Sequence, residues 1–455
     1  METSSVEYPR RANGSNWRRD CMEISEPLLT RTRLKSTGRD LKRKIRERSA
    51  KLGVIGLGFT GLDLAVKMAR AGFQVTAIDM DRRRVESVNS GTSHSMDINS
   101  ETLRAVVTAG NLRATQSFAA VEAVDAVSIC VPAPLTVAQN ADLSYMLASV
   151  EAVHNHLTPG KLIVLESIIP PGTTRNIVLP ILQKSGRVAG EDFFLAYAPK
   201  RRHIGKKTSG FGGPQVIMGG VTSLCSALGA FLHCQFARRI LRVSSVESAE
   251  MVSFFEAAVY NVNRALVHEM ANLCSGLGIE IMEMTKALNF PLFECETLYP
   301  QQPIGQGPIK GSVSAVGIAK PLLLQVAEIV NSKPGALTFS RIAEALNKTK
   351  KSINGSHVLV LGISVSHYTG SVRETCVLDT LRLLHEKGAI VSYHDPDVVS
   401  LEVGGETLTS TAITSETLRT MDCVVFLADD LALDYSIVVA NSRLIIDCRK
   451  GAGKQ

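Results

Sequence analysis

A short glycine-rich segment carries the clearest chemistry in the chain. Residues 56–61 read GLGFTG and match the spacing G-x-G-x-x-G. The apolar run KLGVI precedes them, a helical pattern follows, and Asp79 lies at the end of the next apolar run. In that context the glycines allow a tight turn against a pyrophosphate, and the acid accepts hydrogen bonds from a ribose diol. The pattern therefore predicts a dinucleotide site.

The residues around the turn indicate which dinucleotide it binds. The N-terminus of the helix after the turn supplies N–H groups and a positive dipole to the pyrophosphate. An acid at the ribose would repel a 2′-phosphate, which favours NAD over NADP, although Arg82, Arg83 and Arg84 follow closely and weaken that preference. The alternative is a glycine turn kept only for packing. The predicted cofactor contacts here are Gly56, Gly58, Phe59, Thr60, Gly61, Asp79 and Arg84.

The elements that must position this turn alternate between strand and helix. Short apolar runs recur at 126–132 and 161–167 in the same rhythm. A second alternation of this kind begins near Gly355 and continues to about residue 450. Such alternation predicts parallel sheets with helices on both faces. The expected fold class is therefore α/β, with two Rossmann-like doubly wound domains joined by a long central helix.

The central helix is predicted over residues 244–290. Ser244 or Ser245 can cap its start, with Glu247 and Glu250 in its first turns. The segment is too long and too apolar to lie on the surface of one domain, so we expect an exposed face to pair with a second copy as a homodimer. The expected domain limits are 1–50 for a basic tail, 51–243 for the cofactor domain, 244–350 for the helical dimerisation domain and 351–455 for the C-terminal domain. The tail is expected to be disordered or weakly helical, and residues 33–50 could form a short charged helix.

Composition excludes several classes of protein. No apolar run reaches the ~20 residues of a membrane span, and the first 50 residues lack the apolar core of a secretory signal. Residues 1–50 hold 13 Lys/Arg and 7 Asp/Glu, which accounts for +6 of the net charge of +7, so the nearly neutral body is not typical of nucleic-acid binding. The nine cysteines form no C-x-x-C pair and no metal-ligand spacing. These features predict a cytoplasmic protein with reduced thiols and no metal.

Several segments, taken in order, carry a family resemblance. They are VPAPL, LESIIPPGTT, GEDFFLAYAP and VSSVESAEMV, and with them the chain resembles the UDP-glucose/GDP-mannose dehydrogenase family, most closely its branch acting on UDP-N-acetylhexosamines. The resemblance covers about residues 51–450. It implies NAD as cofactor, a UDP-sugar as substrate bound partly by residues 351–455, and oxidation of the sugar C6 hydroxyl to a carboxylate. It also implies a dimer or a larger assembly.

The resemblance implies site residues as well, and most catalytic ones are replaced here. The family's nucleophilic cysteine corresponds to Pro308, which carries no nucleophile. The family's threonine, lysine, asparagine and final aspartate correspond to Ala133, Ser253, Ala257 and Ser312. Glu166 is the only catalytic candidate retained. Cys295 is the nearest cysteine before the replaced position, and a core or loop thiol is its ordinary interpretation.

Binding positions are implied in the same way. Pro132 and Glu166 are expected at the cofactor, and Lys200, Lys310 and Arg373 are expected at the substrate. Lys200 stands where the family has a carboxylate, and Lys310 has a solvated loop lysine as its alternative interpretation.

Three functions remain open from the sequence. Each lost acid, base or oxyanion group is typically worth ~10²–10⁴ in rate, so the losses together predict a catalytically deficient dehydrogenase. The first function is a dehydrogenase working through a rearranged site. The second is a pseudoenzyme that binds NAD or a UDP-sugar without turnover. The third is a hetero-oligomer partner of an active relative.

Overall fold

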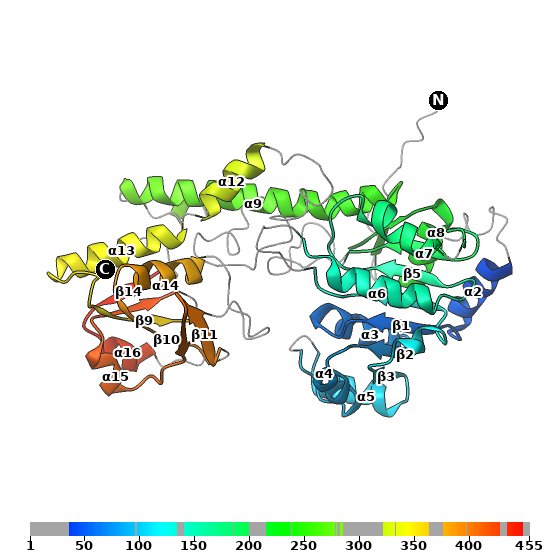
Figure 1. Cartoon of the computed structure of the whole chain (residues 1–455), viewed down its shortest axis with the longest axis horizontal. Coiled ribbons are helices and arrows are strands. Elements are labelled where there is room, and N and C mark those ends of the chain that lie inside the picture. The colour runs from blue at the N-terminus through cyan, green and yellow to red at the C-terminus, as the bar shows by residue number, and fades with distance from the viewer. Residues whose placement is uncertain are drawn as a thin grey trace. The chain divides into compact units, whose positions relative to one another are not determined.

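Two compact units make up the chain, and each is described by itself. The computed structural model describes residues 36–95, 98–133, 141–184, 186–199, 215–237, 239–277, 279, 283–284, 322–332, 334–363, 376–396, 398–427 and 435–448. The first unit comprises residues 1–255 with 311–318, and the second comprises 256–310 with 319–455. Figure 1 draws the whole chain and labels most of its helices and several of its strands.

The first unit is built on an eight-stranded sheet in the order β3-β2-β1-β4-β5-β6-β7-β8. Neighbouring strands are parallel, except that β6 and β7 are antiparallel. The strand order reverses between β1 and β4, which is where a doubly wound sheet binds its ligand. The strands are β1 Lys51–Ile55, β2 Gln74–Ile78, β3 Leu112–Thr115, β4 Ala126–Ile129, β5 Leu162–Leu165, β6 Phe194–Tyr197, β7 Gln215–Gly220 and β8 Arg239–Arg242.

Helices connect these strands and bury them. Every residue of β4, β5 and β6 is buried, as expected for parallel strands covered on both faces. The predicted α/β class and the Rossmann-like arrangement are therefore confirmed. The helices of this unit that follow β1 are α3 Phe59–Arg70, α4 Arg82–Asn89, α5 Ser100–Thr108, α6 Ser144–Asn155, α7 Leu179–Gln183 and α8 Ser223–His233, with short turns η1 Phe118–Val121 and η2 Thr174–Val178.

A helix before β1 corrects the prediction that the tail continues through residue 50, because this helix packs into the core of the first unit. Helix α2 spans Ser36–Glu47, and its Leu41 and Ile45 are buried in the core of the first unit. Lys44 Nζ lies 2.8 Å from Asp125 Oδ1, at the amino-terminal end of β4. The segment is mostly charged, and only two apolar residues one turn apart signal its buried face. Residues before 36, including Trp17, lie outside the described residues.

Lys161 is a buried cation at the start of β5. Its side chain is 1% exposed, and its Nζ donates to the carbonyl oxygens of Val121 and Val124. Burial lowers the pKa of Lys161 to about 8 from an ordinary value of 10.5. Between these two values the unfolded chain binds more protons than the folded chain, so stability rises with pH there.

The difference between the pKa of Lys161 in the folded chain and its ordinary value leads to a testable prediction. Relative to Lys161→Met, the wild-type free energy of unfolding should rise by up to about 3 kcal/mol between pH 8 and pH 10.5. Urea unfolding of both proteins across that range measures the difference. A constant difference across the range would contradict the burial effect. Other groups that titrate in this pH range are present in both proteins, so their contributions cancel in the difference between the two free energies of unfolding.

The second unit contains a smaller parallel sheet in the order β10-β9-β13-β14. Buried clusters lie on each side of it, which again indicates a sheet covered on both faces. Its strands are β9 His357–Leu361, β10 Ile390–His394, β13 Cys423–Phe426 and β14 Ile445–Asp447, beside a hairpin of β11 Ser400–Val403 and β12 Glu406–Thr409. Its helices include α12 Leu322–Ser332, α13 Pro334–Lys348, α14 Cys376–Glu386, α15 Ser415–Thr420 and α16 Tyr435–Asn441.

The long helix α9 runs from Val246 to Gly276. Its residues up to Phe255 are assigned to the first unit, and those from Glu256 are assigned to the second. Ser245 Oγ accepts the Ser248 N–H at 3.1 Å, so the helix starts with the predicted serine cap. It ends before the predicted residue 290, and most residues beyond 277 lie outside the described residues. Within the described ranges, no helix is long and apolar enough to cross a membrane, and no cluster of His, Cys, Asp or Glu could hold a metal ion.

Candidate functional site

The glycine turn after β1 has a different physical requirement at each glycine. Gly56 has φ of 91°, a conformation that side chains rarely adopt. A Cβ on Gly61 would lie 1.8 Å from the Gly56 carbonyl oxygen, so helix α3 can approach β1 only with glycine there. A Cβ on Gly58 would meet no atom of the described residues within 4 Å. The turn therefore has open space over its second glycine, as close approach of a pyrophosphate requires.

Helix α3 starts directly beside this open space. Its N-cap is Gly58, which provides no side-chain hydrogen bond to the first turn. Phe59 and Thr60 are the first two helical residues, so their backbone N–H groups lie at the positive end of the helix dipole. The predicted contacts at Gly56–Gly61 are thus brought together in an arrangement that fits NAD.

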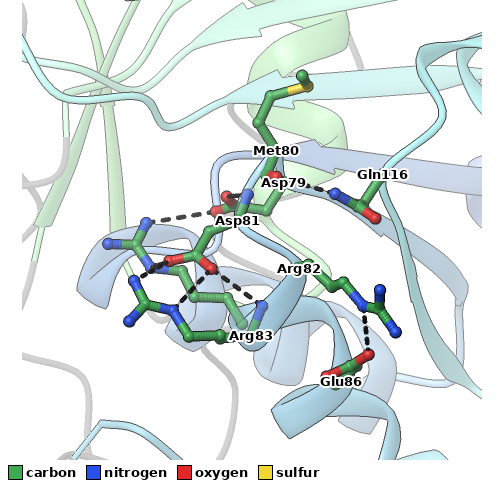
Figure 2. A network of polar contacts seen from close by, with 8 residues as sticks. Asp79, Met80, Asp81, Arg82, Arg83, Glu86 and Gln116 are labelled. Carbon is green, nitrogen blue, oxygen red and sulfur yellow. Dashed lines mark hydrogen bonds and ion pairs between the residues drawn. The ribbon is translucent and has the colours of Figure 1, made fainter.

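Asp79 holds the turn from the end of β2. Its Oδ2 accepts the Leu57 N–H at 2.6 Å, and its Oδ1 accepts the Asp81 N–H at 2.8 Å. Arg84 Nη1 lies 3.4 Å from Oδ2 (Figure 2 shows the surrounding network). The buried carboxylate therefore fixes the glycine turn as well as lying where a ribose diol is expected.

His94 supports the same turn and was not predicted. Its Nε2 lies 2.7 Å from the Leu57 carbonyl oxygen, so both polar backbone groups of Leu57 have side-chain partners. His94 lies between α4 and α5, 37 residues from Leu57, and no local sequence pattern indicates such a contact.

The second unit repeats this arrangement at its own first strand. Gly362 follows β9 with φ of 75°, and the Ile363 N–H donates to Asp395 Oδ2 at 2.8 Å at the end of β10. A strand-end aspartate bonded to the glycine turn is therefore common to both units. Asp79 alone does not indicate a cofactor, and the open space over Gly58 is the more informative feature of the first unit.

The arginines after Asp79 each face an acid. Arg82 Nε lies 2.7 Å from Glu86 Oε1, and Arg83 Nε lies 3.4 Å from Asp81 Oδ1 (Figure 2). The hydrogen bonds from Arg83 lower the pKa of Asp81, which keeps this second carboxylate ionised. Two carboxylates near the ribose position agree with NAD rather than a 2′-phosphate cofactor.

Glu166 lies directly after β5 and is buried against α8. Its Oε1 lies 2.9 Å from His233 Nε2 and accepts a hydrogen bond from Ser128 Oγ at 3.1 Å. His233 was not predicted, because it lies in an apolar helix 67 residues from its partner. The next residue, Ser167, donates to the Val131 carbonyl oxygen at 2.6 Å and so ties β5 to the segment that carries Pro132.

Glu250 joins the segment VSSVESAEMV, to which it belongs, to the segment LESIIPPGTT. Its carboxylate is fully buried and accepts the N–H groups of Gly172 at 2.6 Å and Thr174 at 2.8 Å, with Thr174 Oγ1 at 2.5 Å. Burial raises the pKa of Glu250, while the hydrogen bonds from Thr174 oppose that shift. The acid was expected to serve the start of its own helix, but it serves the start of η2 instead.

The other predicted positions are only partly described. Pro132 and Ala133 follow β4, and Pro132 is exposed. Ser253 and Ala257 lie one turn apart on α9. Burial lowers the pKa of His268, also on α9, to about 4, so its imidazole is neutral near pH 7. The residues that lie outside the described ranges are Lys200, His203, Cys295, Pro308, Lys310, Ser312 and Arg373.

Comparison with protein families gives two matches. Residues 50–237 match the NAD binding domain of the UDP-glucose/GDP-mannose dehydrogenase family. Residues 359–452 match the UDP binding domain of the same family. Helix α2 precedes the first match.

Comparison with individual proteins agrees. The UDP-N-acetyl-D-mannosamine dehydrogenase of Pyrococcus horikoshii is 27% identical over 353 residues, covering 76% of this chain and 84% of that protein. The UDP-N-acetyl-D-glucosamine 6-dehydrogenase of Salmonella typhi is 27% identical over 363 residues, covering 78% of this chain and 84% of that protein. A solved structure of the Pyrococcus horikoshii UDP-D-ManNAc dehydrogenase superposes with a TM-score of 0.77 at 25% identity, covering 89% of this chain and 96% of that chain.

Proposed function

The chain belongs to the UDP-glucose/GDP-mannose dehydrogenase family, and from that membership we propose that it binds NAD and a UDP-sugar but carries out little or none of the family's oxidation. The proposal rests on the contrast between the cofactor turn and the position of the catalytic thiol. The glycine turn has the geometry that NAD requires, whereas the thiol position holds Pro308. The expected ligand class is a UDP-N-acetylhexosamine, as in the names of its relatives.

The binding residues take the following roles in this proposal. NAD, when bound, supplies a hydride acceptor. The open space over Gly58 and the N-terminus of α3 receive its pyrophosphate, and Asp79 orients its ribose. Lys310 and Arg373 are proposed to bind the phosphates of the sugar nucleotide, because cations pair with phosphate oxygens.

The catalytic residues explain the expected deficiency. Ser253 and Ala257 are four residues apart on α9, and neither residue type has the cation or amide that could stabilise an oxyanion as the family's lysine and asparagine do. Without a thiol at residue 308, no thioester can form from the aldehyde intermediate. The second oxidation of the family therefore lacks its nucleophile.

Oxidation of the sugar only as far as the aldehyde is the second candidate function. The thiol acts after the aldehyde has formed, so Pro308 removes the second oxidation and leaves the first formally open. The retention of Glu166 close to β4 favours this candidate. The number of NADH molecules formed per sugar separates it from the binding-only proposal.

Calorimetric titration tests the binding part of the proposal directly. NAD is expected to bind at least tenfold more tightly than NADP, and at least one of UDP-N-acetylglucosamine, UDP-N-acetylmannosamine and UDP-glucose is expected to bind. Binding of none of these ligands, by heat or by a shift in melting temperature, would overturn the proposal and leave a structural role with an active relative.

An apolar stripe on α9 supports a homodimer. Leu266, Met270 and Leu273 on α9, and Leu277 directly after its end, are exposed and follow one another at steps of four, three and four residues. That spacing places them on one side of the helix, as in helices that pair with each other. Helix α12 also exposes apolar residues, namely Leu322, Leu323, Val326 and Ile329.

Charge introduced into the stripe should separate the copies. The double variant Leu266→Glu/Leu273→Glu is expected to convert a dimer into a monomer, because paired apolar side chains cannot bury two carboxylates. Size-exclusion chromatography with light scattering measures the mass, and Glu269→Ala, an exposed change on the same helix, is the matched control. A monomeric wild type, or a dimeric double variant, would refute the homodimer.

A further inference from the structure

Three buried polar side chains meet where β4, β5 and α8 pack together. Ser128 lies on β4, Glu166 follows β5, and His233 ends α8, with exposures of 2%, 5% and 1%. Ser128 is in register with Val164, two residues before Glu166, so Ser128 and Glu166 point to the same face of the sheet. The Glu166 N–H donates to the Ile129 carbonyl oxygen at 2.9 Å, which fixes the backbone below the carboxyl group.

The hydrogen bonds of His233 determine how many protons His233 and Glu166 hold between them. Its Nδ1 lies 2.9 Å from the Gly229 carbonyl oxygen, and a carbonyl only accepts, so Nδ1 carries a proton. Its Nε2 lies 2.9 Å from Glu166 Oε1, and a hydrogen bond there needs a second proton on one of those two atoms. Either arrangement, an imidazolium with a carboxylate or a neutral imidazole with a carboxylic acid, leaves the pair neutral overall.

The strands and the helix that carry the pair bring no further charged side chain to it. The elements that carry the three residues, β4, β5 and α8, and the neighbouring β6 contain no Lys, Arg, Asp or Glu. Helix α8 also packs against the uncharged β7 and against β8 and α2, which are charged. Arg242 of β8 bonds to α8 at Ser226 and Ser223, seven and ten residues before His233. Lys44 of α2 pairs with Asp40 and Asp125.

The other titratable groups of β4, β5, β6 and α8, with those of the residues just after them, are the thiols of Cys130, Cys225 and Cys234 and the phenol of Tyr197, all ordinarily neutral near pH 7. Burial raises the pKa of Cys225 further. A second added proton would therefore leave an uncompensated buried cation, and loss of the shared proton an uncompensated buried anion.

We infer that His233 is a positioning residue that holds Glu166 as half of a neutral, proton-sharing pair, so that Glu166 is not available as a general base. A base must gain a proton from the substrate hydroxyl, and this pair already holds the one it can keep. The consequence for catalysis, that Glu166 cannot act as a general base, rests on the proposed function and deepens it. It also argues against oxidation of the sugar as far as the aldehyde. The proton count itself depends only on the described contacts.

Nuclear magnetic resonance of the full-length protein at pH 7 tests the inference without any ligand. Histidine labelled with ¹⁵N and glutamate labelled with ¹³C at the side-chain carboxyl report where the protons lie. His233→Gln identifies the His233 signals by their loss, and Glu166→Gln identifies the Glu166 signal and perturbs Nε2. Either variant alone suffices for the assignment if the other fails to fold.

The expected spectrum has a proton on Nδ1 and a second on either Nε2 or the Glu166 carboxyl group. In Glu166→Gln the amide N–H can donate to Nε2, so the Nδ1 proton should persist. An unprotonated Nδ1 in the wild type, or a carboxylate at Glu166 beside an Nε2 without a proton, would overturn the inference. Because no cofactor or sugar is added, either result is independent of whether the proposed function is correct.

Discussion

Gly58→Ala is expected to weaken NAD binding at least tenfold while leaving the free energy of unfolding within about 1 kcal/mol of wild type. The added Cβ meets no atom within 4 Å in the part of the chain that the structure describes, so we expect the fold to accommodate it. The same methyl group enters the space proposed for the pyrophosphate, which must approach the backbone closely. Calorimetry measures the affinity for NAD, and denaturation in urea measures stability.

Gly61→Ala is the matched variant, since it adds the same methyl group three residues away. Its Cβ would lie 1.8 Å from the Gly56 carbonyl oxygen, so α3 must move away from β1. Overpacking of this kind typically costs ~1–3 kcal/mol, and NAD binding should fall together with stability. Normal NAD binding by Gly58→Ala would show that the open space is not a pyrophosphate site.

Asp79→Ala is expected to lower NAD affinity by roughly 10- to 100-fold and to reduce the free energy of unfolding by about 1–3 kcal/mol. The affinity falls because the proposed acceptor of the ribose diol is gone. Stability falls because the Leu57 and Asp81 N–H groups, held at 2.6 and 2.8 Å, lose their acceptor. The same titration and unfolding experiments measure both quantities.

Asp395→Ala separates the two effects, because Asp395 makes the equivalent contact in the second unit. Its Oδ2 accepts the Ile363 N–H at 2.8 Å. This variant should lose a similar amount of stability and keep the NAD affinity of the wild type. If Asp79→Ala bound NAD as well as Asp395→Ala does, the role of Asp79 would be structural only.

The sequence predicted the fold well where its signals were local. The run KLGVI coincides with β1, and Ser245 caps α9 as predicted. The prediction assigned the segment of α2 to a tail and missed its packing in the core, because Leu41 and Ile45 are the only apolar pair in a charged segment. It was also too long for α9 within the described residues, since apolar periodicity alone does not show where a helix ends.

The site was predictable only in its local part. The glycine spacing and Asp79 predicted the dinucleotide turn, and the structure adds the distinct steric requirement of each glycine. The contacts of Glu166 with His233 and of Glu250 with Thr174 join residues 67 and 76 positions apart. Pairings at such separations depend on the register of strands and the packing of helices, which residue types and spacing do not specify.

Counting NADH formed per UDP-sugar consumed tests the central claim most directly. Purified protein is incubated with NAD and each UDP-sugar that binds, and NADH absorbance is compared with the sugar products resolved by mass spectrometry. The account predicts binding with no NADH, or at most a trace of it. One NADH per sugar, with an aldehyde product, would show that the first oxidation survives. Two NADH per sugar, with a carboxylate product, would contradict the account and require another nucleophile, for which Cys295 is the first candidate to replace with serine.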